Sequence, residues 1–311
     1  MAIKRVEIKD FRVFKGNFAI DLSPGVNVFI GDNGTGKTTL IKAMYENVKT
    51  VEYHRGLPIS PGKMIFEIGE SNFKLDNVCT VLDVSENLHG IYIPEKDILE
   101  HARGLLPFIE RKQTGFSFIY KDVLIAAQDV PTQEQTETQK SIGEQITDIV
   151  GGTVEWDHGD GSFYTIKTDG SRIPFANEAS AYKKLGFLGL LVSCGRLEPG
   201  CVLFWDEPEN SLNPELIPML IEILLKLALH GVQIFIATHN YDIVRYLDVR
   251  RNKNIPVLFH NMIKTSSGSM TCTTSPEYHT LPDNHLEKAG ENLFKAVAAD
   301  ALGVQDNEHR A

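Results

Sequence analysis

The sequence is poor in cysteine and has no uninterrupted apolar run of membrane-spanning length. Its four cysteines form no CxxC pair and show no metal-binding spacing, so reduced structural thiols in a cytosolic protein are expected. The most apolar long window, residues 216–237, is broken by Pro218, Glu222, Lys226 and Gly231, which is typical of an amphipathic helix followed by a buried strand. The first residues show no signal-peptide pattern. These absences predict a cytoplasmic protein that does not enter a membrane.

The sequence also lacks an excess of positive charge. Its formal net charge is −10, which argues against a protein that coats nucleic acid through bulk charge. Basic residues gather only locally, at residues 183–184 and 245–253. We expect these clusters to be solvated helix ends, and the alternative is a phosphate-binding patch. Binding to nucleic acid therefore remains an alternative, and it would need a local basic site.

What the sequence does contain is a glycine-rich loop, GDNGTGKTT, directly after the apolar run 26–30. A glycine, four residues and then Gly-Lys-Thr, between a strand-like and a helix-like segment, is the P-loop pattern in its required context. The glycines let backbone N–H groups turn toward a phosphate, and the following helix N-terminus adds partial positive charge. The predicted ATP-binding residues of the loop are Asn33, Gly34, Thr35, Gly36, Lys37, Thr38 and Thr39.

Two residues of this loop have specific predicted roles. The Lys37 ammonium is expected to reach the β- and γ-phosphates of ATP, and the Thr38 hydroxyl is expected to bind Mg²⁺. The alternative is a glycine-rich turn that binds nothing. The flanking strand and helix disfavour that alternative.

A second motif, CVLFWDEPENSLNP, places two carboxylates directly after an apolar run. Ligands of open α/β sheets bind at the carboxyl ends of the strands. Asp206 is therefore predicted to hold the Mg²⁺ shell, and Glu207 to accept a proton from the water that attacks the γ-phosphate. His239 ends the next buried run, QIFIATHN. A lone histidine there is usually a capping or core residue, but beside these motifs His239 looks like a switch histidine that senses the γ-phosphate.

Hydrophobic patterning predicts how the chain is organised. From residue 177 the expected elements alternate between helix and strand, at 179–194, 201–205, 214–229 and 232–238, which indicates a parallel sheet covered on both faces. The opening predicts three strands, at 3–9, 17–21 and 26–30. The middle gives a weaker pattern, with strands at 63–68, 78–84, 90–93, 152–157 and 162–167, a helix near 96–104 and an exposed polar helix within 132–150.

These motifs together resemble the ABC-type ATPase heads of the RecF and structural-maintenance-of-chromosomes (SMC) group. The resemblance rests on IKDFRVF before the P-loop, on FWDEPENSLNP with its D-loop at 211–214, and on ATHN. It covers residues 2–45 and 177–246 well and the middle poorly. The chain is most similar to the small stand-alone AAA-family ATPases of this group that occur in bacterial phage-defence operons.

The resemblance implies an α/β fold, a P-loop NTPase of ABC-ATPase type with a mixed sheet, an N-terminal antiparallel β subdomain and a helical signature lobe. We expect one domain over 1–311. Its parts would be 1–50 with the P-loop, 51–176 as an inserted α/β lobe, 177–260 with the signature helix, Walker B motif and switch strand, and 261–311 with a C-terminal strand and helix.

The resemblance also implies an ATP-dependent homodimer, with each ATP held between one P-loop and the opposite subunit's signature motif. The chain departs from the family here, because NEASAYKKLGFLGLL lacks the glycine of the usual serine-glycine pattern. Ser180 is the residue predicted to contact the opposing γ-phosphate. The alternative is that Ser180 caps its own helix. For the Q-loop, Gln128 and the segment 94–96 are both candidates.

The predicted function is an ATPase that converts ATP and water to ADP and phosphate and switches a dimer between open and closed states. Its setting would be DNA maintenance or anti-phage defence, with a separate effector protein. The alternative is the nucleotide-binding subunit of an ABC transporter, which shares the same catalytic residues. A P-loop kinase is disfavoured by Glu207, the D-loop and His239. Long coiled-coil arms are excluded, because the interval 39–201 is too short and lacks heptads.

Overall fold

The centre of the fold is a six-stranded sheet with an antiparallel strand at one edge. The computed structural model describes residues 2–53, 66–67, 78–82, 88–110, 118–128, 134–251, 253–266 and 268–302. The strand order is β13-β12-β3-β11-β10-β6, and β13 is the antiparallel edge while the other five run parallel. The strands are β3 (Val26–Ile30), β6 (His89–Ile93), β10 (Cys201–Asp206), β11 (Gln233–Ala237), β12 (Val257–Lys264) and β13 (Met270–Ser275).

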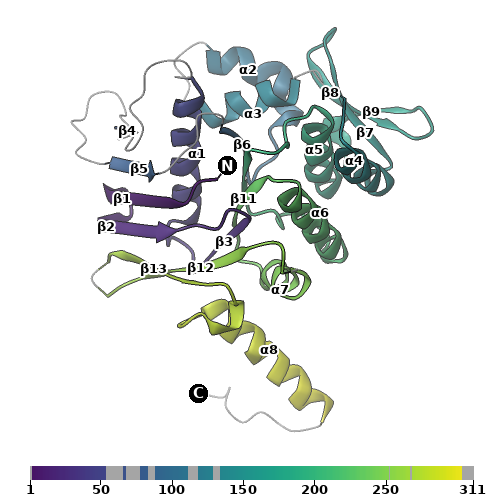
Figure 1. The fold of residues 1–311 in the computed structure, drawn as a ribbon. Helices are drawn as coiled ribbons and strands as arrows, with labels where there is room; N and C mark the ends of the chain where they lie inside the picture. The colour runs from purple at the N-terminus through teal and green to yellow at the C-terminus, as the bar shows by residue number, and fades with distance from the viewer. Residues whose placement is uncertain are drawn as a thin grey trace.

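The central strands are apolar on both faces because helices cover both sides of the sheet. Every residue of β3, β10 and β11 is buried, as expected for strands of a doubly covered parallel sheet. Figure 1 shows α1 on one side and α5, α6 and α7 on the other. These helices are α1 (Lys37–Tyr53), α5 (Ser180–Ser193), α6 (Ile217–Leu229), which the 3-10 turn η3 (Pro214–Leu216) precedes, and α7 (Tyr241–Arg250).

A second, antiparallel sheet lies on the far side of α1 (Figure 1). Its order is β2-β1-β5-β4, and its strands are β1 (Arg5–Phe11), β2 (Phe14–Asp21), β4 (Phe66–Glu67) and β5 (Val78–Leu82). In β2, Phe18 and Ile20 are buried while their neighbours Ala19 and Asp21 are exposed. This alternation is the pattern of a sheet with one solvated face. Of the strands predicted at 63–68 and 78–84, residues 63–65, 68 and 83–84 lie outside the described residues.

The middle of the chain forms a mostly helical lobe with a small sheet. It contains η1 (Leu99–His101), α2 (Ala102–Glu110), α3 (Phe118–Gln128), α4 (Glu137–Val150), the antiparallel strands β7 (Gly152–Asp157), β8 (Ser162–Lys167) and β9 (Arg172–Pro174), and η2 (Phe175–Asn177). The predicted α/β fold with a mixed sheet, an antiparallel N-terminal subdomain and a helical lobe is confirmed.

Helix α4 corrects one expectation about the exposure of this lobe. The polar composition predicted an exposed helix, but Ile142, Ile146 and Val150 are buried, and α4 packs beside α5. The helix begins with a capping box between Thr136 and Gln139, which satisfies two backbone donors at once. Three apolar residues at a spacing of four are enough to bury one face of an otherwise polar helix.

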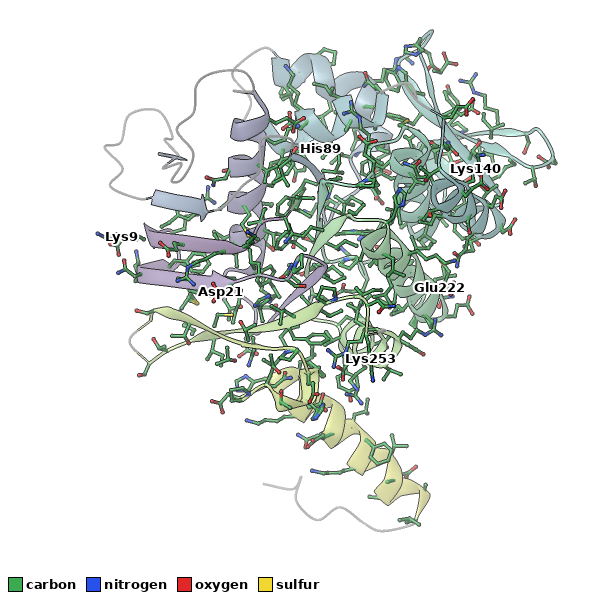
Figure 2. All side chains as sticks on the ribbon, viewed as in Figure 1. Lys9, Asp21, His89, Lys140, Glu222 and Lys253 are labelled. Atoms are coloured by element: carbon green, nitrogen blue, oxygen red, sulfur yellow. The ribbon has the colours of Figure 1, made fainter. Side chains whose placement is uncertain are left out.

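The last described helix, α8 (His285–Ala301), projects from the body beyond η4 (Tyr278–Thr280) (Figure 1). It begins at the N-cap Asn284 and buries none of its residues. At Gly290 it crosses the ring of Tyr241, where an added Cβ would lie 2.5 Å from ring carbons. Charged side chains such as Lys9, Asp21 and Glu222 lie on the outer surface (Figure 2). Within the described part of the chain, no helix combines the length and apolarity needed to cross a bilayer.

Candidate nucleotide-binding site

The loop between β3 and α1 has a backbone shape that requires glycine at two positions. Gly31 has φ +137° and Gly36 has φ +90°, both in the region that favours glycine. A Cβ at Gly31 would lie 2.2 Å from the Met262 carbonyl oxygen, and a Cβ at Gly36 would lie 2.7 Å from Val13 Cγ2. The loop therefore forms a close backbone cradle at the carboxyl end of β3, with Asn33 exposed at its tip.

Lys37 is folded back into this cradle. Its Nζ donates to the carbonyl oxygens of Gly31 at 2.7 Å and Asp32 at 3.0 Å, and the residue is only 8% exposed. Burial lowers the pKa of Lys37, and the nearby carboxylates of Glu207 and Asp32 oppose that shift. The ammonium is thus held over the loop by neutral backbone acceptors, which an anionic phosphate can replace.

Thr38 and Asp206, the two predicted metal ligands, touch each other across the site. The Thr38 hydroxyl donates to Asp206 Oδ1 at 2.9 Å, and the Tyr92 hydroxyl donates to Asp206 Oδ2 at 3.1 Å. Burial raises the pKa of Asp206, while the two hydroxyl donors lower it. Tyr92 comes from β6, which lies beside β10 in parallel register, so a neighbouring strand orients the carboxylate.

The donor set fits Mg²⁺ held together with phosphate. Among the described residues, no group of three or more His, Cys, Asp or Glu side chains has the geometry to hold a metal ion. A hydroxyl and one carboxylate, as in Thr38 and Asp206, are instead the typical protein share of a magnesium site that phosphates and water complete. The cradle, Lys37 and this pair lie together at one edge of the sheet.

Glu207 and His239 meet at the same edge. His239 Nδ1 lies 3.2 Å from Glu207 Oε1, and the backbone N–H of Glu207 donates to the Ala237 carbonyl at 2.9 Å. Glu207 has φ +48°, a left-handed conformation that is costly for a residue with a Cβ. The side chains of Glu207 and His239 are 25% and 54% exposed, so both are open to solvent at this edge of the sheet.

Glu209 fixes the backbone beneath this pair. Its Oε1 accepts from the Thr238 hydroxyl at 2.6 Å and from the His239 N–H at 3.3 Å. Burial raises the pKa of Glu209. The carboxylate thereby ties the turn after β10 to the end of β11.

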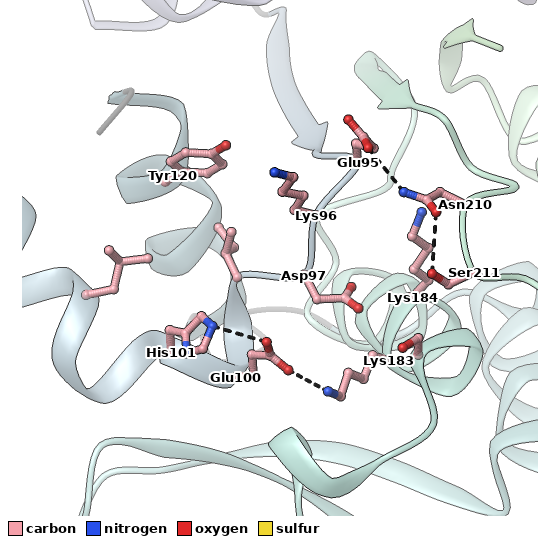
Figure 3. Close-up of a pocket in the computed structure, with 13 residues that line it drawn as sticks. Glu95, Lys96, Asp97, Glu100, His101, Tyr120, Lys183, Lys184, Asn210 and Ser211 are labelled. Carbon is pink, nitrogen blue, oxygen red and sulfur yellow. Dashed lines mark hydrogen bonds and ion pairs between the residues drawn. The ribbon is translucent and has the colours of Figure 1, made fainter. Parts of the chain in front are cut away.

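Ser180 lines a second pocket, of about 660 Å³. The N-cap of α5 is Ala179, without a side-chain cap bond, and Ser180 is the first helical residue, so the self-capping alternative is wrong. Ser180 is exposed. Figure 3 shows Glu95, Lys184, Asn210 and Ser211 gathered in this pocket. Asn210 Nδ2 donates to Glu95 Oε1 at 3.3 Å.

The two Q-loop candidates lie in different places. Glu95 follows β6 and enters the pocket with Ser180. Gln128 is the last residue of α3, about 12 Å along the helix axis from Tyr120, the α3 residue that lines the pocket. Of the two, the segment 94–96 is therefore the one that the fold brings to the Walker B edge.

The expectation that the basic clusters are solvated helix ends is wrong for Lys183 and Lys184, which are buried, whereas in the second cluster Arg250 is exposed and Arg245 and Arg251 are half-buried. Lys183 pairs with Glu100, and Lys184 donates to the Glu207 carbonyl at 2.9 Å. In the second cluster three arginines have partners within the fold: Arg245 and Arg251 pair with Asp248, and Arg250 donates to the Pro218 carbonyl. Lys253 is exposed. The fold thus engages five of these side chains internally, which weakens a phosphate-binding patch.

Two protein families match successive parts of the chain. Residues 1–77 match the family described as "AAA ATPase domain". Residues 100–245 match the family described as "AAA domain, putative AbiEii toxin, Type IV TA system". The two matches cover the P-loop and the Walker B and switch strands respectively.

Curated relatives are similar over short segments. The DNA replication and repair protein RecF of Acidothermus cellulolyticus is 50% identical over 44 residues, which is 14% of this chain and 12% of that protein. RecF of Salmonella typhi is 39% identical over 66 residues, 21% of this chain and 17% of that protein. The matched segment therefore spans less than a fifth of either RecF protein.

Solved structures resemble almost the whole chain. The SmcHead bound to the C-winged helix domain of ScpA has a TM-score of 0.52 at 13% identity, covering 88% of this chain and 98% of that one. An Smc head domain with an extended coiled coil, bound to the C-terminal domain of ScpA derived from Pyrococcus furiosus, has a TM-score of 0.50 at 12% identity, covering 95% and 99%. The chain has the fold of an ABC-type P-loop ATPase.

This ABC-type ATPase fold brings together most of the predicted residues and adds others. Lys37, Thr38, Asp206, Glu207 and His239 share one sheet edge. The sequence prediction missed Tyr92 and Glu209, and it expected Lys184 to be part of a solvated helix end. A second glutamate two positions after Glu207 was a signal for Glu209, whereas Tyr92 and Lys184 join the site only through tertiary contacts.

Proposed function

We propose that this protein binds and hydrolyses ATP, and that ATP joins two copies of it into a dimer. The observation that carries this proposal is the Thr38–Asp206 contact of 2.9 Å, with Glu207 and His239 beside it and the glycine cradle in front. This is the constellation that phosphoryl transfer to water requires: a phosphate cradle, a metal pair and a positioned base.

Each residue of the site has its own role in the proposed hydrolysis of ATP. Lys37 exchanges its two backbone carbonyl partners for phosphate oxygens, and the cradle N–H groups donate to the same phosphates. Thr38 and Asp206 would hold Mg²⁺, which when bound neutralises charge on the phosphate oxygens. Glu207 accepts the proton of the attacking water, and His239, 3.2 Å from Glu207 Oε1, orients the carboxylate.

The dimer proposal is supported by the place of Ser180. The pocket that Ser180 enters is lined by residues such as Glu95, Asn210 and Ser211, and none of its lining residues in the described chain belongs to the P-loop. A γ-phosphate that reaches Ser180 would therefore come from the P-loop of a second copy. The subunit that would form this dimer has the same fold as the SmcHead structure.

The wider setting stays a prediction. The RecF relatives and the family described with a Type IV TA system motivate a role in DNA maintenance or anti-phage defence, with a separate effector protein. Residence in the cytoplasm stays a prediction as well. Among the described residues with placed side chains, Cys194, Cys201 and Cys272 are free thiols, which agrees with reduced cysteines.

The test is the variant Glu207→Gln. The amide keeps the size of the side chain but cannot accept the proton, so turnover should fall by a factor on the order of 10² or more while ATP binding persists. Trapped ATP should then hold two subunits together. Light scattering should report a dimer with ATP and Mg²⁺ and a smaller mass without them.

The matched control is Glu222→Gln on the outer face of α6, where the side chain is 49% exposed. It should hydrolyse ATP like the wild type and show no trapped dimer. Undiminished hydrolysis by Glu207→Gln would remove Glu207 from the base role. If the molecular mass of Glu207→Gln is the same with and without ATP, the dimer proposal is refuted and the ATPase proposal stands.

A further inference from the structure

The backbone carbonyl of Glu207 has a charged partner that the catalytic scheme above does not use. Lys184 Nζ donates to this oxygen at 2.9 Å, and the backbone N–H of Asn210 donates to the same oxygen at 3.1 Å. Lys184 is 3% exposed, and burial lowers its pKa. An ammonium this deeply buried is costly unless its donors are well placed.

The contact acts on a strained residue. Glu207 has φ +48°, a conformation that persists only where the surroundings hold it. The surroundings here are the Ala237 carbonyl on its N–H side and Lys184 with Asn210 on its C=O side. The backbone angles φ and ψ of Glu207 set the direction in which its carboxylate points. The ammonium of Lys184 therefore helps to orient the catalytic base.

Lys184 also links this backbone to the helix that carries Ser180. The two residues are four apart in α5 and therefore lie on one face of the helix. Both line the pocket shown in Figure 3, where Lys184 lies beside Asn210 and Ser211. A shift of the α5 N-terminus is thus transmitted over one helical turn to the carbonyl of Glu207.

We propose that Lys184 is a positioning residue for Glu207, and that it makes the aim of the base depend on the position of helix α5. The inference rests on the ATPase proposed above. It deepens that proposal, because engagement of Ser180 by the second subunit would then regulate water activation at the first subunit's own ATP.

The experiment compares Lys184→Met with Lys167→Met. Methionine keeps the apolar stem of lysine but cannot donate, so Lys184→Met should lower kcat about 10- to 100-fold, the scale of a catalytic group displaced by about an ångström. The KM for ATP should stay within about threefold, because Lys184 does not line the cradle. Lys167 is the matched control: its side chain is only 18% exposed and its Nζ donates to a backbone carbonyl, that of Val150, at 3.0 Å, but it lies outside this pocket, and its variant should keep wild-type kcat.

A double-mutant cycle separates positioning from general damage. In the Glu207→Gln background, Lys184→Met should cause no further loss of single-turnover rate, because the group that it aims is already gone. A structural defect would instead multiply the two losses. If Lys184→Met fails to fold in thermal denaturation, Lys184→Leu, which also lacks a donor, replaces it. Lys184→Gln, whose amide keeps an N–H donor, should lose less of the wild-type kcat than the donorless variant.

The outcomes discriminate between the two proposals. Wild-type kcat in the folded variant that lacks a donor, or equal losses in both backgrounds, would overturn the positioning role while the wild-type enzyme still hydrolyses ATP. A wild-type chain without ATPase activity would overturn the proposed function and this inference together.

Discussion

At the scale of the residue, Lys37 is the most direct test of nucleotide binding. Its two backbone acceptors are part of the loop itself, so truncation leaves no buried charge behind. Lys37→Ala should weaken ATP binding at least about tenfold, since a charge-assisted contact of about 1.5–3 kcal/mol is lost, while the melting temperature changes by a few degrees at most. Titration calorimetry and thermal denaturation measure the two effects. Lys9→Ala, on the outer surface, is the control, and wild-type affinity in Lys37→Ala would refute the P-loop assignment.

The candidate site was predictable where local pattern dictates it. The loop residues and the pair Asp206 and Glu207 follow from spacing, because a P-loop and a carboxyl-terminal strand end each bring their own backbone geometry. Tyr92 and Lys184 could not be predicted, since their roles depend on which strand neighbours β10 and on how α5 packs. A lysine in a helix is usually solvated, which is why Lys184 was misread.

At the scale of the element, helix α5 makes a prediction about Ser180. Ser180 is not the N-cap of α5, which is Ala179, so Ser180→Ala should leave the subunit folded and its ATP affinity within about twofold of wild type. ATP-dependent dimerisation, measured by light scattering across protein concentrations, should weaken by about tenfold, the effect of one lost charge-assisted hydrogen bond. Unchanged dimerisation would mean that Ser180 has no role across the interface.

Element boundaries follow the same division between local and tertiary information. The strands predicted at 26–30, 152–157 and 162–167 match β3, β7 and β8, and the helix predicted at 179–194 is α5 within one residue at each end. Turn residues and apolar runs fix these locally. The position of β6 beside β10, with about 110 residues between them, has no local signal. The burial of one face of α4 has one, in the spacing of Ile142, Ile146 and Val150, but the polar composition of the segment outweighed it in the prediction.

At the scale of the whole molecule, stability should depend on a buried histidine of strand β12 in the central sheet. His260 is fully buried, with Nδ1 2.9 Å from Thr274 Oγ1 and Nε2 3.2 Å from Asn27 Oδ1. Burial lowers its pKa from 6.5 to about 3. Between these values the unfolded chain binds a proton that the folded chain refuses, so stability falls as the pH drops below 6.5.

At pH 5, protonation of His260 in the unfolded chain should lower the free energy of unfolding by about 2 kcal/mol relative to neutral pH. Urea denaturation at about pH 7 and pH 5 should therefore show a steeper loss for the wild type than for His260→Gln, whose amide does not titrate. Parallel pH profiles for the two proteins would show that His260 protonates in the folded state.

The order of strands in the central sheet also bears on how the protein is made. β3 pairs with β11 on one side and β12 on the other, and both partners follow it by about 200 residues or more. At about 5–20 residues per second, a ribosome leaves the strand before the P-loop without either neighbour for about 10–40 s. The strand β3, in which four of the five residues are apolar, thus leaves the ribosome with both edges unpaired, and we expect the nascent chain to bind a chaperone. The nucleotide cradle, although early in the chain, is among the last parts to be completed.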